Sequence, residues 1–488
     1  MKKYIIIAFA AALTLVSCGK DFLEEAPKLA QSDVLTLSTF EGLDMATAGA
    51  YAPLAASSWY GASFILTNEM QTMNGKRWPE FTKYDSGRYR DEYSVRYTPS
   101  STKGLWSTAY YVILSCNSVI NTLDKEDNGI EATEAQKNNI KAECLFLRAL
   151  AHFDLVRTYA MPYNYAIAAG TKEPACLGVP VVLTVDAQAQ PARATMADTY
   201  QQIVADLLEA ERIIDPSYAR AGGSDNYSKV TLTAIQALLS RVYLYSENWQ
   251  GAADYATKVI NSGKYSMWTA DKVKDGAGNV WREEPRTAGE VIFEVYCNTT
   301  QTYGTGNENV CGMSSYNGYG DCGASADLLN LYEDGDVRKT LVSPDKDGNA
   351  LFTMKYFGKG LGTIDAANIV ILRLSEMYLN RAEAILHGAS VSGASAAEDL
   401  AIVAKNRNAT PLQPTLSNVY LECAKEFAWE AHLWFDLART GRDMTRTDVS
   451  GTSVPTEIKA GDYRWAMPIA AREFTVNENL VQNDGYSK

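Results

Sequence analysis

Cys18 is the residue whose surroundings most directly suggest a chemical role. It follows an apolar run at residues 4–16, which is preceded by Lys2 and Lys3, and charged residues come soon after it. A run this short suits the core of an export signal and falls below the roughly 20 residues of a membrane-spanning helix. Three roles fit this position: a structural thiol, a metal ligand, or a point where the chain is cut and attached.

The neighbours of Cys18 favour attachment. Residues 15–18 read L-V-S-C, which resembles the bacterial lipobox, where the chain is cut before the cysteine and the cysteine is acylated, with palmitate among the acyl chains. We expect residues 1–17 to be a lipoprotein signal peptide and residues 18–36 a lipid-anchored tether. The lysine and acidic residues at 20–25 resemble the signal that sends lipoproteins to the outer leaflet of the outer membrane. The alternative is an ordinary export signal that is cut further along.

The remaining cysteines form no C-x-x-C pair. Cys311 and Cys322 flank a Gly-rich stretch, and outside the cell a disulfide between them is chemically allowed and would pin that loop. The sequence alone does not fix which cysteines pair.

Few residues support enzymatic or metal chemistry. His152, His387 and His432 are the only histidines; they lie in helical patterns without metal-ligand spacing. No nucleophile-elbow, P-loop or dinucleotide-binding glycine motif occurs. Residues 345–349 read D-K-D-G-N, like a calcium loop, but the downstream bidentate carboxylate is missing. We therefore expect a protein without catalytic activity, cofactor or metal. A secreted glycoside hydrolase, which needs two facing carboxylates, remains the enzymatic alternative.

Net charge and apolar content limit the classes of partner and of fold that we expect. The formal net charge is −13 at pH 7, the opposite of what a phosphate-binding surface needs, so nucleic acid is not expected. Apolar residues make up 46% of the chain, enough for a sizeable core.

Most of the chain shows apolar residues at helical spacing, and the predicted helices would form such a core. Residues 142–159 and 195–215 repeat apolar side chains at three and four, which predicts amphipathic helices, the second capped by Thr195. Residues 231–247 and 252–262 flank a turn and mix small with large apolar residues, as in tetratricopeptide-like helix pairs.

A second such pair is expected at residues 368–387 and 396–406. Residues 59–99 and 264–361 break the helical pattern and are rich in Gly, Asn and aromatic residues, with one strand-like run at 290–296. Loops this long are often functional.

Seven motifs, in order along nearly the whole chain, resemble the SusD/RagB family of surface lipoproteins. The most specific is NIVILRLSEMYLNRAEA at residues 368–384. The others are CGKDFLEEAP, LWSTAYYVILSCNSVIN, AECLFLRALAHFDLVRTYAMPY, LGVPVV with RATMADTYQQIVADLLEA, ECAKEFAWEAHLWFDLARTGR, and RWAMPIAAREFTVNENLVQNDGY. Two departures are Ala424 and Leu433, where the family commonly carries arginines that look structural, and M-P-I-A in place of P-I-P near the end.

The resemblance implies a mainly α fold of tetratricopeptide-like helix pairs, with little β structure and a loop-rich, aromatic ligand-binding face. It implies one SusD-like domain at residues 37–488, with halves at 37–225 and 226–488 and the loop-rich segment 264–361 in the second half. It also implies a protein of the outer membrane, exposed at the cell surface, that binds oligosaccharide or polysaccharide nutrients and acts as the lid of a SusC-like TonB-dependent transporter. Some members handle peptides, so a peptide ligand stays open, as does a lid whose ligand contacts come from the transporter.

Aromatic rings suit a glycan because flat rings match the apolar faces of a pyranose and polar side chains match its hydroxyls. Trp106, Trp249, Trp429, Trp434 and Trp465 lie in helical patterns, at a repeat turn or in the C-terminal motif, and are expected in the core. The candidates for ligand contact lie in the irregular segments, and Trp78 and Trp281 are the strongest. The full set is Trp59, Tyr60, Asn74, Arg77, Trp78, Trp268, Trp281, Tyr303, Tyr316 and Tyr319.

Overall fold

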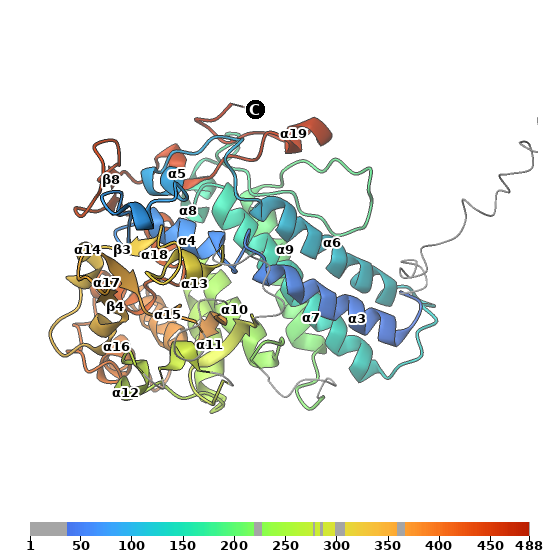
Figure 1. The fold of residues 1–488 in the computed structure, drawn as a ribbon. Helices are drawn as coiled ribbons and strands as arrows, with labels where there is room; N and C mark the ends of the chain where they lie inside the picture. The colour runs from blue at the N-terminus through green and yellow to red at the C-terminus, as the bar shows by residue number, and fades with distance from the viewer. Residues whose placement is uncertain are drawn as a thin grey trace, which may run out of the picture.

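The computed structural model of the protein describes residues 37–218, 227–276, 279–283, 286–297, 308–358 and 367–487. Within these residues the fold is mainly helical, as expected, and the strands are short (Figure 1). The α-helices are α3 (Phe40–Tyr51), α4 (Ser63–Met70), α5 (Arg90–Ser94), α6 (Leu105–Leu123), α7 (Glu134–Tyr159), α8 (Tyr163–Ala168), α9 (Met196–Ile213), α10 (Leu232–Tyr245), α11 (Trp249–Asn261), α12 (Ala270–Val273), α13 (Val310–Met313), α14 (Ala326–Leu329), α15 (Leu374–Leu386), α16 (Ala396–Lys405), α17 (Leu416–Glu426), α18 (Leu433–Arg439) and α19 (Glu473–Val476). Short 3-10 turns are η2 (Ala52–Ala55), η3 (Thr82–Tyr84), η4 (Val280–Arg282), η5 (Val337–Leu341) and η6 (Tyr463–Trp465).

The N-terminal helices α3, α6, α7 and α9 pack side by side, on the right of Figure 1. The predicted helices at 142–159 and 195–215 are confirmed as α7 and α9. Thr133 starts α7 with a capping box, and the Thr195 hydroxyl accepts the Asp198 N–H at the start of α9. Tyr51, at the end of α3, donates to the Glu143 carboxylate of α7 at 2.6 Å. These caps and side-chain bonds satisfy helix ends and fasten neighbouring helices.

The predicted helix pairs form the C-terminal scaffold. Helix α10 packs against α11, α11 against α15, and α15 against α16. One boundary was wrong: residues 369–373 form strand β6 rather than the start of a helix, and α15 begins at Leu374. The run I-V-I-L is rich in β-branched residues, and it pairs antiparallel with β2 (Val291–Val295), the strand predicted at 290–296.

A small four-stranded sheet, in the order β1-β3-β5-β4, joins the two irregular segments of the chain. Its strands are β1 (Gly75–Lys76), β3 (Gly323–Ala324), β5 (Leu351–Thr353) and β4 (Val342–Pro344); the separate hairpin pair is β7 (Met444–Thr445) and β8 (Glu457–Ile458). Because β1 lies beside β3, residues 74–90 and 308–358 form one surface region, which we call the loop face.

The main apolar cluster contains residues from Leu43 to Leu480 and draws on both halves of the chain. A network of buried charges lies beside it. The Glu426 carboxylate on α17 accepts bonds from Arg338 at 2.9 Å, Arg373 at 2.5 Å and Arg407 at 2.7 Å. The carboxylates of α17 therefore find arginines from other elements, although Ala424 and Leu433 replace the arginines common in the family.

The predicted signal peptide, the tether and Cys18 lie outside the described residues. Across the part of the chain that the structure describes, no helix is both long enough and apolar enough to cross a membrane.

Candidate functional site

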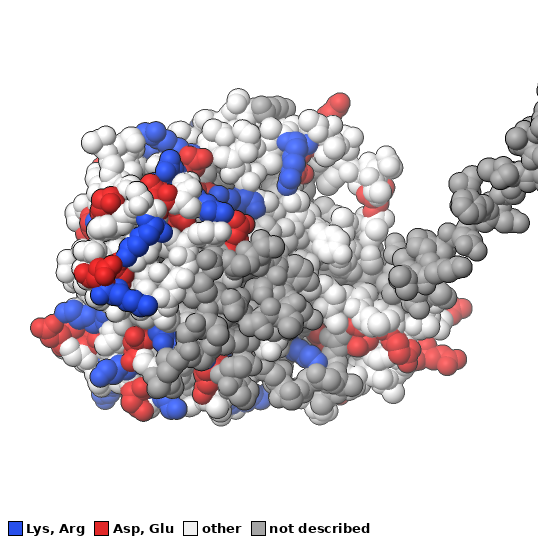
Figure 2. All heavy atoms as spheres, viewed as in Figure 1, with Lys and Arg blue, Asp and Glu red and all other residues white. Residues whose placement is uncertain are grey.

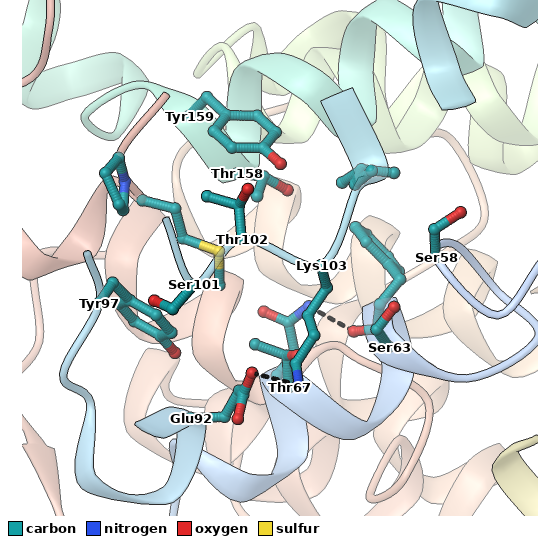
Figure 3. Close-up of a pocket in the computed structure, with 15 residues that line it drawn as sticks. Ser58, Ser63, Thr67, Glu92, Tyr97, Ser101, Thr102, Lys103, Thr158 and Tyr159 are labelled. Atoms are coloured by element: carbon teal, nitrogen blue, oxygen red, sulfur yellow. Dashed lines mark hydrogen bonds and ion pairs between the residues drawn. The ribbon is translucent and has the colours of Figure 1, made fainter. Parts of the chain in front are cut away.

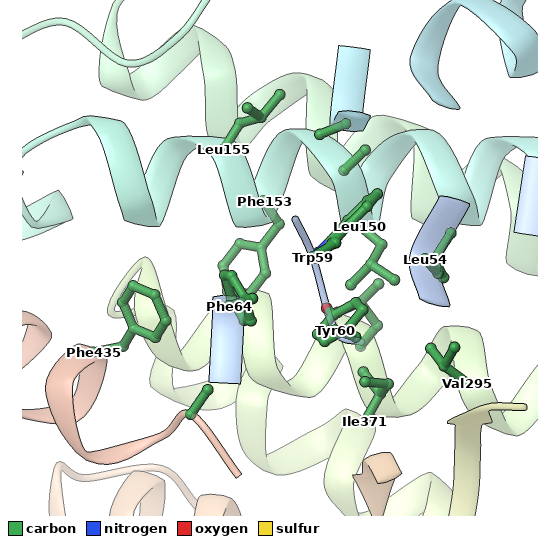
Figure 4. Packing of buried hydrophobic residues seen from close by; sticks show 14 of the residues in the cluster. Leu54, Trp59, Tyr60, Phe64, Leu150, Phe153, Leu155, Val295, Ile371 and Phe435 are labelled. Carbon is green, nitrogen blue, oxygen red and sulfur yellow. The ribbon is translucent and has the colours of Figure 1, made fainter. Parts of the chain in front are cut away.

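Trp59 and Tyr60 lie in the scaffold core, among the buried rings of Figure 4. Trp59 Nε1 and the Tyr60 hydroxyl donate to the same Asp154 oxygen, at 2.7 and 2.5 Å, and Arg157 pairs with the other oxygen at 2.6 Å. Neither ring offers a face to a ligand in this conformation. Their sequence neighbourhood looked irregular because the chain turns sharply before α4, but the turn is packed against α7.

Trp268 and Trp281 are also buried, and they pack edge to face with centroids 5.2 Å apart. The Lys355 ammonium lies 4.5 Å from the centroid of the Trp281 ring. These two rings fill a second apolar cluster under the loops instead of lining its surface.

The loop face is held together by three buried residues, Asn74, Arg77 and Trp78. Asn74 donates to the buried Glu69 carboxylate at 2.7 Å, and Arg77 pairs with Asp85. Trp78 is 8% exposed, packs beside Phe81, and lies against the backbone of Gly323 so closely that a Cβ there would clash. Lys76 covers its ring at 4.1 Å. In this conformation the Trp78 ring supports the sheet.

Tyr316 and Tyr319 are the predicted aromatics that reach the surface in the described structure, and both are half-buried. Tyr316 rests on Phe352 and Phe357, with ring centroids 5.9 and 5.2 Å away. Tyr303 lies outside the described residues. The ligand contacts of all these residues stay predictions; Tyr316 and Tyr319 are the described candidates whose rings are partly exposed.

Charged and hydroxyl groups surround Tyr319. The Arg88 guanidinium lies 4.4 Å from the centre of the Tyr319 ring and pairs with Glu308 at 2.5 Å. The hydrogen bond with Glu308 raises the pKa of Arg88, which keeps the guanidinium charged. Arg88 also donates to the Ser86 hydroxyl at 2.9 Å, and Ser86 in turn donates to the buried Asp321 at 2.7 Å. We call this set, Tyr319 with Arg88, Glu308, Ser86 and Asp321, the Tyr319 platform.

The loop that carries Tyr316 and Tyr319 is closed by backbone hydrogen bonds. The N–H of Gly320 donates to the carbonyl of Gly312 at 3.2 Å, and that of Cys322 to Met313 at 3.0 Å. Gly320 has φ +65°, a conformation that glycine adopts without strain. The allowed Cys311–Cys322 disulfide is not formed, since Cys322 carries a free, buried thiol, so hydrogen bonds hold the loop ends together.

A pocket opens near the loop face, between α4, α5 and the segment leading into α6 (Figure 3). Lys103 pairs with Glu92 at 3.2 Å on its wall, and Tyr97 donates to Gln71 at 2.5 Å. The buried Asn68 Oδ1 and Thr158 Oγ1 on its lining have no hydrogen-bond partner within the described residues. Ordered water commonly completes such groups. Lys103 also lies 4.8 Å from the ring of Tyr89, next to Arg88, which places this pocket beside the Tyr319 platform.

The residues predicted from sequence to contact a ligand did not include Arg88, Glu308, Glu92 and Lys103. Arg88 lies in S-G-R-Y-R, which combines glycine, two arginines and a tyrosine within an irregular segment. This composition is the sequence signal that could have pointed to Arg88. The expected core positions of Trp106, Trp429, Trp434 and Trp465 are confirmed, since all four are buried. The expectation for Trp249 was wrong: it is half-buried and stacks on the His387 ring, with centroids 3.8 Å apart.

Two family profiles match the chain in sequence order. The profile described as "Starch-binding associating with outer membrane" matches residues 21–244, and the profile "SusD family" matches residues 349–486. The chain belongs to the SusD/RagB family.

Individual relatives agree with this membership. A SusD-like protein of Bacteroides ovatus is 26% identical over an alignment that covers 90% of this chain and 82% of the relative. The starch-binding protein SusD of Bacteroides thetaiotaomicron is 24% identical, with 80% of each chain covered. The crystal structure of a SusD superfamily protein from Bacteroides vulgatus superposes with a TM-score of 0.80 at 27% identity, covering 92% of this chain and 100% of that one.

Proposed function

We propose that this protein is a lipid-anchored cell-surface protein that binds oligosaccharide or polysaccharide nutrients. It passes them to a SusC-like TonB-dependent transporter in the outer membrane, over which it acts as a lid. The observation that carries the proposal is the family match at both ends of the chain, one part of which is described as starch-binding and associated with the outer membrane.

The Tyr319 platform has the parts that a sugar site needs. A pyranose that stacks its C–H face on the Tyr319 ring takes the place of the Arg88 guanidinium, which lies 4.4 Å from the ring centre, and its hydroxyls then lie within reach of that charged group. At Tyr319 the charged side chains are Arg88, a donor, and Glu308, an acceptor, and Ser86 adds a hydroxyl. Tyr316, in the same loop, supplies a second ring for a longer chain of sugars.

Four carboxylates of the loop face are held by arginines, hydroxyls or a backbone N–H, an arrangement that suits hydrogen bonding to a ligand. A glycosidase needs one carboxylate to act as an acid and a second, facing it, as base or nucleophile. Here Glu308 pairs with Arg88, Asp85 with Arg77 and Arg90, and Asp321 accepts from Ser86. The Asp345 carboxylate also accepts hydrogen bonds from neighbouring groups. Burial acts to raise its pKa, but bonds from the Asn349 N–H and the Tyr84 hydroxyl lower it to about 2.

The test is native affinity electrophoresis of the protein without residues 1–18 through gels that contain different polysaccharides, with starch included because one relative is named for it. We expect retardation by one glycan class, lost in Tyr319→Ala. The matched control is Tyr165→Ala, an exposed tyrosine on α8. Calorimetry with a peptide digest runs in parallel. Heat from peptides without any retardation would replace the glycan proposal by a peptide-binding one.

Anchoring is tested separately on the full chain. Cys18→Ala should release the protein from the outer-membrane fraction, and metabolic labelling with a fatty acid should mark the parent chain but not the variant. A labelled Cys18→Ala protein would contradict the lipid anchor while leaving the glycan proposal in place.

A further inference from the structure

The outward face of α6 carries no charge. None of the 19 residues of this helix is Asp, Glu, Lys or Arg. Tyr111 is 61% exposed and Leu114 is 38% exposed. The hydroxyls of Ser115 and Ser118 donate back to the carbonyls of Tyr111 and Leu114, at 2.8 and 3.0 Å, so they offer no donor hydrogen to water or to a partner. A surface helix of a soluble protein normally presents charged residues on this side.

A neighbouring segment extends the uncharged face. Tyr110 donates to the carbonyl of Pro180 at 2.8 Å, and Asn117 donates to that of Val182 at 3.0 Å, so residues 180–184 run along α6. Leu183 and Val185 are 36% and 54% exposed there. We call Tyr111, Leu114, Leu183 and Val185 the α6 patch. In Figure 2 the surface over α6 is mostly white, with a group of red side chains below it on the same side of the view and mixed blue and red side chains on the opposite side.

We propose that the α6 patch is the surface that docks against the extracellular side of the transporter barrel. This inference rests on the proposed function. Apolar, uncharged surface of this kind, with an exposed tyrosine, has the composition of the centre of a protein–protein interface.

The position of the predicted anchor supports this occupant. Residues 19–36 separate Cys18 from the first described residue, and 18 residues span at most about 65 Å when fully extended. The chain then enters α3, which packs directly against α6. The tether therefore keeps the α6 patch within reach of proteins in the same membrane.

Two other occupants fit less well. Binding to a lipid surface is favoured by several Lys and Arg around the apolar residues, whereas α6 itself has none and the described contacts place one arginine on it, Arg472, which donates to the Ser107 hydroxyl at 2.9 Å. A second copy of this chain would carry the same formal net charge of −13, which opposes association.

The test is photo-crosslinking in intact cells, with a photoreactive phenylalanine at position 111 or 185 of the full chain. The control position is Lys405, an exposed residue on α16. We expect crosslinks to a TonB-dependent barrel, identified by mass spectrometry, from positions 111 and 185 but not from 405. Crosslinks to a second copy, to lipid or to residues 19–36 of the same chain would overturn the docking proposal.

A tagged full chain, purified from the same membranes, separates the two levels of inference. If the barrel co-purifies but crosslinks only from position 405, the patch is wrong and the proposed function stands. If no barrel co-purifies, the transporter partnership itself fails, and the docking proposal fails with it.

Substitution gives an independent readout. Leu114→Glu should lower the amount of co-purified barrel at least tenfold, without changing the retardation of the soluble protein by glycan. The matched control is Leu208→Glu on α9, because Leu208 is 39% exposed and lies outside the patch. Equal co-purification with Leu114→Glu and Leu208→Glu would contradict the proposal.

Discussion

The carboxylates of the C-terminal core and those of the loop face occupy opposite environments. Glu426 is buried and shared by three arginines, whereas Glu308 is half-exposed and pairs with the one arginine that lies over Tyr319. Removing a partner from a buried ion pair is costly, because the remaining charge stays desolvated, while an exposed pair is weakened by water and salt. The same ion-pair chemistry therefore supports the fold in one region and leaves groups available to a ligand in the other.

The largest expected effect comes from Glu426→Gln. Burial acts to raise the pKa of Glu426, but Arg407, Arg373 and Arg338 hold it well below its usual value. A depressed pKa means that the ionised form stabilises the fold at all pH values above the usual carboxyl range, and the neutral variant loses this contribution. We expect a loss of about 3–5 kcal/mol in the free energy of unfolding at pH 7, measured by chemical denaturation.

The matched control for this substitution is Glu308→Gln, which changes the same side chain in an exposed pair. A loss below about 1 kcal/mol is expected there. Equal losses in the two variants would remove the distinction between the two regions.

The second effect concerns Glu69, which connects the two regions. Its carboxylate accepts from Asn74 of the loop face at 2.7 Å and from the N–H of Ala431 in the scaffold at 2.8 Å. Burial raises the pKa of Glu69 to about 7, against the bonds from these groups. A raised pKa favours the protonated form in the fold, so stability is present below the unfolded value near 4.5 and is lost as pH rises through about 7. The loss amounts to about 3 kcal/mol between these limits.

Glu69→Gln should flatten this pH profile. The side-chain oxygen of Asn74 has no partner within the described residues, so rotation of the Asn74 amide would let it accept from the new glutamine. Denaturation midpoints measured from pH 4.5 to 8 provide the comparison. A parent protein whose stability rises over this range, once other groups are accounted for by the variant, would contradict the assignment.

Tyr319→Ala tests whether the loop face contributes to ligand binding. We expect a loss of about 1–3 kcal/mol in binding free energy for the glycan identified by electrophoresis, because a ring at the centre of a contact carries much of its energy. The free energy of unfolding should fall by less than this, since the ring is only half-buried against the main apolar cluster. Calorimetric titration and denaturation of the same preparation test both statements. Tyr319→Phe is the control and should retain the stacking contribution.

The smallest expected effect is the coupling between Arg88 and Glu308. A double-mutant cycle on stability, with Arg88→Met and Glu308→Gln, should give about 0.2–1 kcal/mol. The same cycle on glycan affinity should give a larger coupling if both side chains contact one sugar. Zero coupling in affinity would place the ligand elsewhere on the loop face.

Much of the scaffold could be predicted from local pattern. The stripe in α7, the Thr195 cap and the alternation of small and large residues in α10 and α11 all report backbone structure within a few residues of themselves. Strand β6 could not be separated from the helix after it, because its partner β2 lies more than 70 residues earlier in the chain. A short apolar run is consistent with either a buried strand or a buried helix.

The ligand-contact residues were harder to predict than the scaffold helices, because their exposure also depends on distant parts of the chain. Residue type and an irregular neighbourhood cannot distinguish a tryptophan that supports a loop from one that faces solvent. Trp281 and Tyr319 occur in similar sequence surroundings, yet Trp281 is buried under Lys355 and Trp268, whereas Tyr319, with Arg88 over its ring, remains half-buried at the surface. The contacts that decide this come from distant parts of the chain, as when β3 brings Gly323 against Trp78.

The way α3 is fastened has a mechanical consequence. Any pull on the chain ahead of residue 37 reaches the folded body first through α3, which packs against α6 and α7 and is tied to α7 by the bond from Tyr51 to Glu143. The load then passes through these contacts between helices into the scaffold. Because these contacts come before the segment that leads through α4 and β1 to Arg88, they take up part of the load before it reaches the Tyr319 platform.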